Sequence, residues 1–241
     1  MSALRAAIFD VDGVLVASPH ERAWREALSG YADPARFTTE FYQAYVAGKP
    51  RLDGAKATLE RLSVPNASER APEYAEKKQA LIDHLIDEGS FEAFPDAVRF
   101  AAGLDAAGLR LALASSSKNA DSMLQRLSLP DGRTLLSIFD ADLSGREVRH
   151  GKPDPELFLL AADALKAPPS ECVVVEDAPA GVKAANAGGM ASLGIARLGD
   201  EKLLHDAGAG LVVTSLDDVD IQALAAGGLR AHQAAEGRPH A

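Results

Sequence analysis

The chain has 241 residues, a formal net charge of −10, 47% hydrophobic residues and 25% charged residues. This length fits one large domain or one domain with an insertion, and the composition is typical of a globular protein rather than a disordered chain. The acidic balance argues against a nucleic-acid-binding protein, although local cations and a metal could still hold a small anionic substrate.

The single cysteine, Cys172, excludes an internal disulfide and a cysteine zinc cluster. The N-terminal segment lacks the long apolar stretch of a secretory signal. No window reaches the roughly 18 uncharged apolar residues that a membrane span needs. We therefore expect a cytoplasmic protein with no membrane partner, present as a monomer or a weak dimer.

Short apolar runs that stop at polar residues predict five buried strands. These runs span residues 6–9, 109–114, 172–175, 191–195 and 211–213. Helical patterns lie between them at residues 96–107, 121–127, 155–165 and 180–187. This alternation predicts an α/β fold, a parallel sheet with helices on both faces.

One stretch, from about Pro19 to Phe91, carries only helical periodicity. Its pattern predicts helices at residues 20–28, 38–45, 54–62 and 72–87, inserted directly after the first strand, with hinges at Pro19 and Phe94-Pro95. We expect an α/β core of residues 1–15 and 94–241 and a helical domain of residues 16–93. Residues 225–241, rich in Gly, Ala and His, are expected to form a frayed tail.

The first strand leads directly into two acidic residues. In open α/β sheets, ligands bind beyond the carboxyl ends of the strands. Asp10 and Asp12 stand at this end, and Gly13 permits a sharp turn. One carboxylate could act as a nucleophile, as in aspartyl-phosphate chemistry, while the other transfers protons. The simpler alternative is an acid that only stabilises a turn or a helix start.

The second strong strand leads into a polar run, Ser-Ser-Ser-Lys-Asn at residues 115–119. Hydroxyl and backbone N–H groups at a strand-to-helix junction can bind phosphate, and the same residues could serve only as helix caps. Further along, Lys152 lies in a loop stiffened by two prolines. A fixed ammonium there would offset repulsion between a carboxylate nucleophile and a phosphoryl group, whereas most lysines are solvated surface charges.

The third buried strand ends in two adjacent acids, Glu176 and Asp177. Like charges at the end of a buried strand are costly unless a cation neutralises them. Together with Asp10, they would form an all-oxygen site of the kind that Mg²⁺ prefers, with water and phosphate oxygens as further ligands. The alternative is a strand-end acid that caps the next helix.

Together, and in this order, these elements resemble the four motifs of the haloacid dehalogenase superfamily of phosphotransferases. The resemblance covers about residues 1–15 and 94–220 and implies a Rossmann-like sheet with an inserted helical cap. It implies a nucleophile that becomes an aspartyl phosphate, an acid/base that also gives its backbone carbonyl to Mg²⁺, and two residues that hold the phosphoryl group. In that order, the implied catalytic residues are Asp10, Asp12, Ser115 and Lys152, and the implied metal site is Asp10, Asp12, Glu176 and Asp177.

The inserted helices resemble the cap of the β-phosphoglucomutase-like subfamily, as does the 114–119 stretch in the core. A mutase that passes through a bisphosphate needs a second phosphate site, and the planar guanidinium of Arg51 suits one. The resemblance implies a substrate-binding set of His20, Trp24, Arg51, Lys78, Ser116, Ser117, Lys118 and Asn119. Other roles remain open: a helix cap for His20, core packing for Trp24 and a solvated side chain for Arg51.

The chain departs from the subfamily pattern in the first hinge. The segment between Asp12 and His20 is two residues shorter, and Ala17 stands where many relatives have Asp. The main hypothesis is a Mg²⁺-dependent mutase that interconverts β-glucose 1-phosphate and glucose 6-phosphate, and the alternative is a phosphatase for a small sugar phosphate. A non-catalytic binding protein is disfavoured by the intact motifs, and a dehalogenase by Asp12. A dinucleotide-binding role is disfavoured because no G-x-G-x-x-G follows the first strand.

Overall fold

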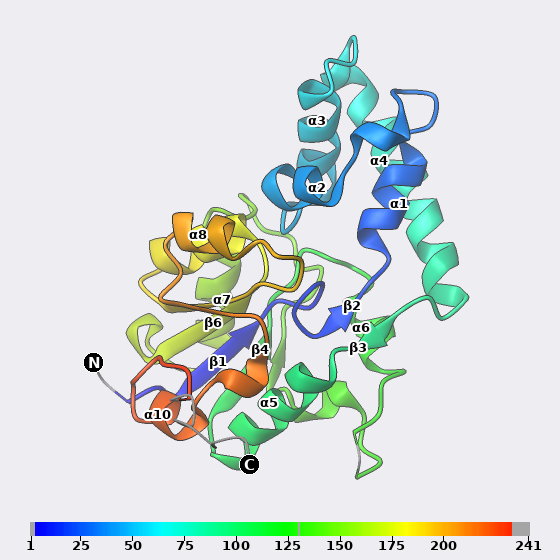
Figure 1. The fold of residues 1–241 in the computed structure, drawn as a ribbon. Helices are drawn as coiled ribbons and strands as arrows, with labels where there is room; N and C mark the ends of the chain where they lie inside the picture. The colour runs from blue at the N-terminus through cyan, green and yellow to red at the C-terminus, as the bar shows by residue number, and fades with distance from the viewer. Residues whose placement is uncertain (1–2, 130, 233–241) are drawn as a thin grey trace, which may run out of the picture.

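A computed structural model describes residues 3–129 and 131–232 (Figure 1). Six parallel strands form one sheet in the order β5-β4-β1-β6-β7-β8, which confirms the predicted α/β fold. The strands are β1 Ala6–Phe9, β4 Arg110–Leu113, β5 Ala141–Asp142, β6 Cys172–Glu176, β7 Ala191–Ile195 and β8 Leu211–Val213. Phe9 of the central strand β1 is level with Leu113 and Val175 of its two neighbours. The residues that follow these three strands therefore meet at one edge of the sheet.

Alternate residues of each strand enter different hydrophobic clusters on the two faces of the sheet. Phe9 and Val173 belong to one cluster, with residues of α5 and α6, whereas Ile8 and Val174 belong to the other, with residues of α7 and α8. Figure 1 shows α7 and α8 on one side of the sheet and α5 on the other. The helices of this part are α5 Pro95–Ala106, α6 Ala120–Leu124, α7 Glu156–Ala164, α8 Pro179–Ala187, α9 Glu201–Asp206 and α10 Ile221–Ala225.

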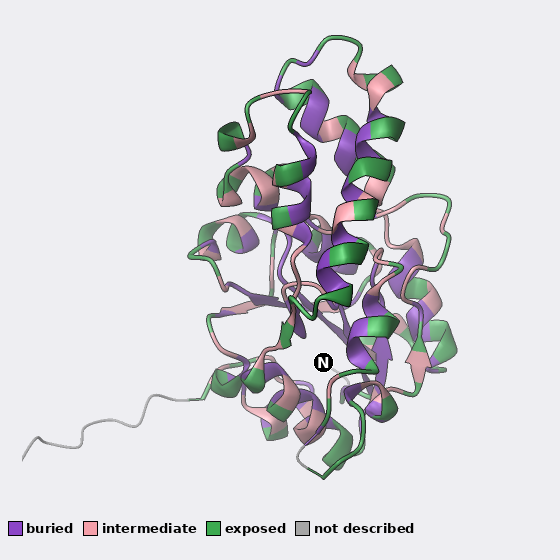
Figure 2. Cartoon of the chain, turned by 90° about the vertical axis from the view of Figure 1, so that its right-hand side faces the viewer, coloured by how far each residue is buried: buried purple, intermediate pink, exposed green. Residues whose placement is uncertain are grey.

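Four helices stand beyond the carboxyl edge of the sheet (Figure 1). They are α1 His20–Ala27, α2 Thr39–Tyr45, α3 Arg51–Arg61 and α4 Ala67–Asp87, and they pack around a hydrophobic cluster of their own. The two ends of this insertion meet in a small antiparallel sheet of β2 (Val16–Ala17) and β3 (Glu92–Ala93). Figure 2 shows buried stripes on the helices that face one another and exposed residues on their outer sides. No helix of residues 3–129 and 131–232 has the length and apolar character needed to cross a bilayer.

Several boundaries differ from the prediction. Helix α3 begins three residues earlier than predicted. Helix α4 begins at Ala67, so Pro72, which was expected at the start of this helix, lies inside it. Proline fits the backbone φ angle of a helix. A helix that contains it is destabilised mainly because one backbone hydrogen bond is lost and the ring clashes with the preceding turn. The short elements β2, β3, β5, α9 and α10 were not predicted, since two to six residues carry too little periodicity.

The predicted frayed tail is wrong for its first residues. Ala225 ends helix α10, and Leu229 packs against the core. The backbone N–H of His232 donates to the carbonyl of Asp218 at 2.7 Å, and that of Asp220 donates to Arg230 at 3.2 Å. These backbone contacts hold the segment that follows α10 on the sheet domain. The remainder of that prediction, residues 233–241, lies outside the described residues.

Candidate active site

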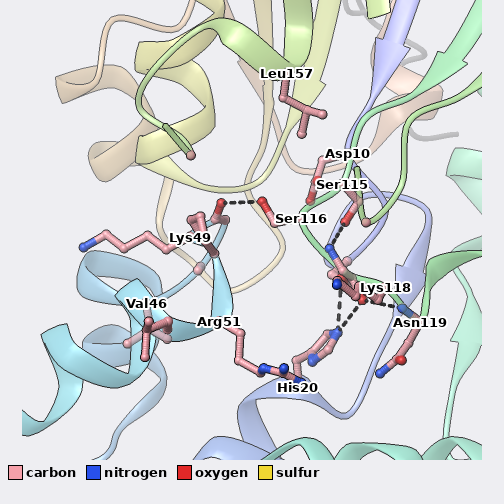
Figure 3. Close-up of a pocket in the computed structure, with 18 of the residues that line it drawn as sticks. Asp10, His20, Val46, Lys49, Arg51, Ser115, Ser116, Lys118, Asn119 and Leu157 are labelled. Carbon is pink, nitrogen blue, oxygen red and sulfur yellow. Dashed lines mark hydrogen bonds and ion pairs between the residues drawn. The ribbon is translucent and has the colours of Figure 1, made fainter. Parts of the chain in front are cut away.

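A cavity of about 580 Å³ lies between the carboxyl edge of the sheet and the inserted helices (Figure 3). It brings eleven of the twelve predicted catalytic and substrate-binding residues together. From the core they are Asp10, Asp12, Ser115, Ser116, Ser117, Lys118 and Asn119, and from the inserted helices they include His20, Arg51 and Lys78. Trp24 and Asp177 also line the cavity. Lys152 and Glu176 are not on its wall; they lie just behind Asp10, with which Lys152 forms an ion pair.

Three carboxylates from adjacent strand ends form a buried cluster. Asp10, Glu176 and Asp177 each place a carboxylate oxygen within 4.8 Å of the other two. The Lys152 ammonium donates to Asp10 Oδ1 at 2.9 Å and to Glu176 Oε1 at 2.5 Å. The other Glu176 oxygen accepts the backbone N–H of Ala178 at 3.1 Å. The cluster is therefore anchored by hydrogen bonds as well as by burial.

The charge of this cluster fits a divalent cation. Three carboxylates share one ammonium, which leaves two negative charges uncompensated in a buried site. Burial raises the pKa of Asp10 to about 7 against the lowering effect of Lys152, and the neighbouring Glu176 and Asp12 add to the rise. Burial, Glu176 and Asp10 likewise raise the pKa of Asp177 well above its usual range. An oxygen-only donor set of this charge suits Mg²⁺.

Two glycines allow the chain to pass close to these carboxylates. A Cβ atom on Gly13 would lie 2.0 Å from Asp177 Oδ2, and the φ of Gly13 is +80°, a conformation that residues with side chains rarely adopt. A Cβ atom on Gly181, in helix α8, would lie 1.8 Å from Glu176 Oε1. Any side chain at either position would displace a carboxylate of the cluster.

The carboxylate of Asp12 is not part of that cluster and contacts His20 instead. His20 Nε2 lies 3.3 Å from Asp12 Oδ2, and His20 Nδ1 lies 2.6 Å from Lys78 Nζ. When Lys78 is charged it can only donate, so Nδ1 accepts and Nε2 carries the proton, with both Ser117 Oγ at 3.2 Å and Asp12 within reach. Burial opposes ionisation of Asp12, but the contact with His20 outweighs it and holds the pKa of Asp12 below its usual range. Asp12 is therefore a carboxylate at neutral pH.

Lys78 and Trp24 form the inner wall on the side of the inserted helices. Burial lowers the pKa of Lys78 to about 7 even though Asp12 favours its charged form. Its ammonium lies 5.2 Å from the centre of the Trp24 ring. Trp24 is 4% exposed and its ring packs on Tyr74 with centroids 5.2 Å apart. Packing in the helical core therefore accounts for most of the Trp24 surface, although one edge lines the cavity.

A second polar group lies across the cavity from Asp10 (Figure 3). The Arg51 guanidinium donates to Gln79 Oε1 at 2.6 Å and approaches Glu76 Oε1 at 3.2 Å. Gln79 Nε2 in turn lies 3.4 Å from Asn119 Oδ1, which connects the inserted helices to the core. Ser117 Oγ lies 3.2 Å from His20 Nε2, and Lys118 is largely exposed at the cavity mouth. Residues from both parts of the chain thus form one polar wall.

The loop between α2 and α3 is docked on the core beside the acidic cluster. Ser116 Oγ donates to the carbonyl of Gly48 at 3.4 Å. A Cβ atom on Gly48 would lie 3.4 Å from Ala178 Cβ, and one on Gly151 would lie 2.0 Å from Pro50 Cγ. These contacts close the cavity on that side.

Several cavity residues were not predicted. They are Tyr42, Val46, Ala47, Gly48, Lys49, Pro50, Leu52, Gln79, Gly145, Arg146, Glu147, Val148, Gly151 and Leu157. Gln43, which contacts Asp177 from helix α2, was also missed. The apolar pattern of residues 38–45 predicts a helix but does not say which polar side chain turns toward the core. The one nearby signal was the predicted substrate-binding residue Arg51, which begins the next helix.

Comparisons with known proteins find similar sequences over most of the chain. A profile of the haloacid dehalogenase-like hydrolases matches residues 4–189. A Mycobacterium bovis protein named beta-phosphoglucomutase is 34% identical over 241 residues, covering 90% of this chain and 91% of that protein. A Thermotoga maritima protein named phosphorylated carbohydrates phosphatase is 32% identical over 211 residues, covering 86% and 92%.

Solved structures show the same fold. An archaeal beta-phosphoglucomutase from a hyperthermophilic Pyrococcus strain superimposes with a TM-score of 0.72 at 32% identity. That match covers 92% of this chain and 99% of the archaeal one, so it includes the inserted helices as well as the sheet.

Proposed function

The chain belongs to the haloacid dehalogenase-like hydrolases, and from that premise we propose that it is a Mg²⁺-dependent sugar-phosphate mutase that works through an aspartyl phosphate on Asp10. The proposed reaction interconverts β-glucose 1-phosphate and glucose 6-phosphate. Relatives named as a beta-phosphoglucomutase and as a phosphatase of phosphorylated carbohydrates support a phosphorylated sugar as the substrate.

One observation carries the choice of a mutase. The cavity has polar groups suited to a phosphate on two walls. Asp10 and Ser115 lie on one, with Lys152 just behind Asp10, and Arg51 of the inserted helices lies on the other, connected to Asn119 through Gln79. A bisphosphate bound between them would present one phosphate for transfer while the other holds the sugar in position. A phosphatase that acts on a single phosphate has no need of the second wall.

The reaction would proceed in two steps. In the first, the C6 hydroxyl oxygen of β-glucose 1-phosphate attacks the phosphorus on Asp10, the bond from phosphorus to Asp10 breaks, and Asp12 accepts the hydroxyl proton. The product is glucose 1,6-bisphosphate. After the sugar has turned over, Asp10 attacks the C1 phosphate, and the departing C1 oxygen takes the proton back from Asp12. Glucose 6-phosphate leaves, and Asp10 is phosphorylated again.

The surrounding residues would each assist in a different way. Ser115 and Lys152 would hold the transferring phosphoryl group, and His20 would keep Asp12 oriented through the contact at 3.3 Å. Asp10, Asp177, Glu176 and the backbone carbonyl of Asp12 would hold Mg²⁺. When bound, that ion would neutralise charge on the carboxylates and on the phosphoryl oxygens.

We further propose that residues 16–93 act as a cap over a core formed by residues 1–15 and 94–241. The inserted helices have a hydrophobic cluster of their own, and the chain enters and leaves them through the paired strands β2 and β3. Closure of such a cap would keep water away from the aspartyl phosphate, which favours transfer to a sugar over hydrolysis.

A phosphatase for a small sugar phosphate is the alternative. In that reaction a water molecule, rather than a sugar hydroxyl, attacks the phosphorus on Asp10. The Thermotoga maritima relative favours it, as does the present pairing of Arg51 with Glu76, which occupies part of the guanidinium.

Replacing Arg51 by Ala tests the role of the second wall. We expect the mutase kcat/KM to fall about 100-fold, in line with the loss of a charged contact worth about 2–3 kcal/mol. Hydrolysis of p-nitrophenyl phosphate, which has a single phosphate, should change less than about threefold. Arg22→Ala, an exposed residue of the same helical insertion, is the matched control. Equal losses in both reactions would show that Arg51 does not hold a second phosphate.

A further inference from the structure

Helix α2 of the inserted helices places one polar side chain against the acidic cluster of the core. Gln43 is 5% exposed, and its Nε2 donates to Asp177 Oδ2 at 3.5 Å. Asp177 is 7% exposed and belongs to the three-carboxylate cluster. The contact joins two residues that are 134 positions apart in the chain, so it forms only when the inserted helices are docked on the core.

The other end of the same amide points to a ligand. Gln43 Oε1 is buried and accepts no hydrogen bond from any residue in the described part of the chain. Buried amide oxygens are nearly always paired. Water molecules that accompany a hydrated Mg²⁺ ion are hydrogen-bond donors, and magnesium in proteins usually keeps several of them. The amide therefore matches a metal site at both ends: its NH₂ group contacts a ligating carboxylate, and its oxygen can accept from water.

The docked loop that follows α2 holds this helix in place. Gly48 lies against Ala178 and the Lys152 side chain, and Pro50 lies against Gly151. Ser116 Oγ adds a hydrogen bond to the Gly48 carbonyl. Any movement of the inserted helices away from the core would break these contacts and withdraw Gln43 from Asp177.

We propose that Gln43 is a positioning residue of the magnesium site, supplied by the inserted helices, and that Mg²⁺ binding and docking of those helices strengthen each other. The inference rests on the proposed function in one respect, because it takes the acidic cluster to be a Mg²⁺ site. Coupling of this kind is reciprocal: if docking tightens metal binding, metal binding must stabilise docking by the same factor.

Calorimetric titration of the full chain with MgCl₂, without substrate, tests the first half of the proposal. Gln43→Leu removes both polar ends of the amide but keeps most of the side-chain volume. Loss of an outer-shell partner typically weakens metal binding about 10–100-fold, and we expect a loss in that range. Gln125→Leu, at an exposed position of the core, is the matched control and should bind Mg²⁺ like the wild type. Should Gln43→Leu fail to fold, Gln43→Met takes its place.

Hydrogen exchange tests the second half. We expect MgCl₂ to slow amide exchange in residues 39–50 of the wild type and of Gln125→Leu, and to have no such effect in Gln43→Leu. Equal Mg²⁺ affinity, within twofold, for Gln43→Leu and the wild type would overturn the role of Gln43 while leaving the proposed function intact. Unchanged exchange in the wild type on adding Mg²⁺ would overturn the coupling. If the wild type did not bind Mg²⁺ at all, the metal-dependent proposed function would fail together with this inference.

Discussion

At the scale of single residues, two carboxylates only two positions apart have opposite environments. Asp10 lies in the acidic cluster, where burial raises its pKa to about 7, whereas the contact with His20 keeps the pKa of Asp12 low. The Lys152 ammonium touches Asp10 and not Asp12. This separation suits one residue to bind a phosphoryl group and metal, and the other to exchange protons.

Asp10→Asn removes the proposed nucleophile with almost no change in shape. We expect kcat to fall at least about 10³-fold, as for other residues that form the covalent bond. The melting temperature should stay the same or rise, because the substitution removes one of three buried carboxylates. Mutase assays and thermal unfolding check both parts, with the exposed Asp105→Asn as control. Substantial remaining turnover would rule out Asp10 as the nucleophile.

Lys78 gives a prediction about pH. Its pKa is lowered from the ordinary 10.5 to about 7 by burial, so the unfolded chain binds this proton more tightly than the folded one. This difference in pKa lowers the free energy of unfolding. The loss is largest below about pH 7 and disappears as the pH rises toward 10.5.

The variant Lys78→Met lacks this cost at every pH. We therefore expect its melting temperature, relative to that of the wild type, to be highest at and below about pH 7. This difference should decline by on the order of 10 °C by pH 10, at about 1.4 kcal/mol per pKa unit and about 2–4 °C per kcal/mol. Thermal unfolding at several pH values measures this difference. A difference that does not change with pH would mean that Lys78 keeps its ordinary pKa in the folded protein.

At the scale of elements, the contact between the docked loop and the core depends on Gly151. Its missing side chain leaves room for the Pro50 ring, since a Cβ atom would lie 2.0 Å from Pro50 Cγ. Gly151→Ala should therefore hold the loop away from the core. We expect mutase kcat/KM to fall about 10–100-fold, because small displacements of positioned groups are costly in catalysis.

A second substitution makes this prediction specific. Pro50→Ala removes the ring that Gly151→Ala would strike, so the double variant should recover most of the lost activity. Steady-state kinetics of the two single variants and the double variant measure the interaction. Additive losses in the double variant would show that the Pro50–Gly151 contact does not govern docking.

The connection between the sheet and the inserted helices shows why some elements could not be predicted. The Arg197 guanidinium donates to the carbonyls of Gly13 and Val14, pairs with Asp96 at 3.0 Å and stacks on Phe94 at 3.8 Å. One side chain thus contacts both connecting segments, although it lies about a hundred or more positions from each. The pairing of β2 with β3 also joins distant segments, Val16 with Ala93, and neither contact leaves a local pattern in the residues involved.

At the scale of the whole molecule, predictability follows the distance between interacting residues. The parallel sheet was predicted because continuous apolar runs and helical periods are local signals. The neighbourhood of Asp10, Ser115 and Asp177 then followed, since strand ends of one parallel sheet meet at one edge. Gln43 could not be predicted, because its contact with Asp177 depends on how the inserted helices pack against the sheet. The substrate likewise depends on that docked cavity.

The central claim is that the phosphoryl group passes from Asp10 to a sugar rather than to water. The most direct measurement mixes the protein with Mg²⁺, β-glucose 1-phosphate and a trace of glucose 1,6-bisphosphate, and follows glucose 6-phosphate and free phosphate together. We predict that glucose 6-phosphate accumulates without a matching release of phosphate. Phosphate release without glucose 6-phosphate would contradict the mutase and identify the enzyme as a phosphatase.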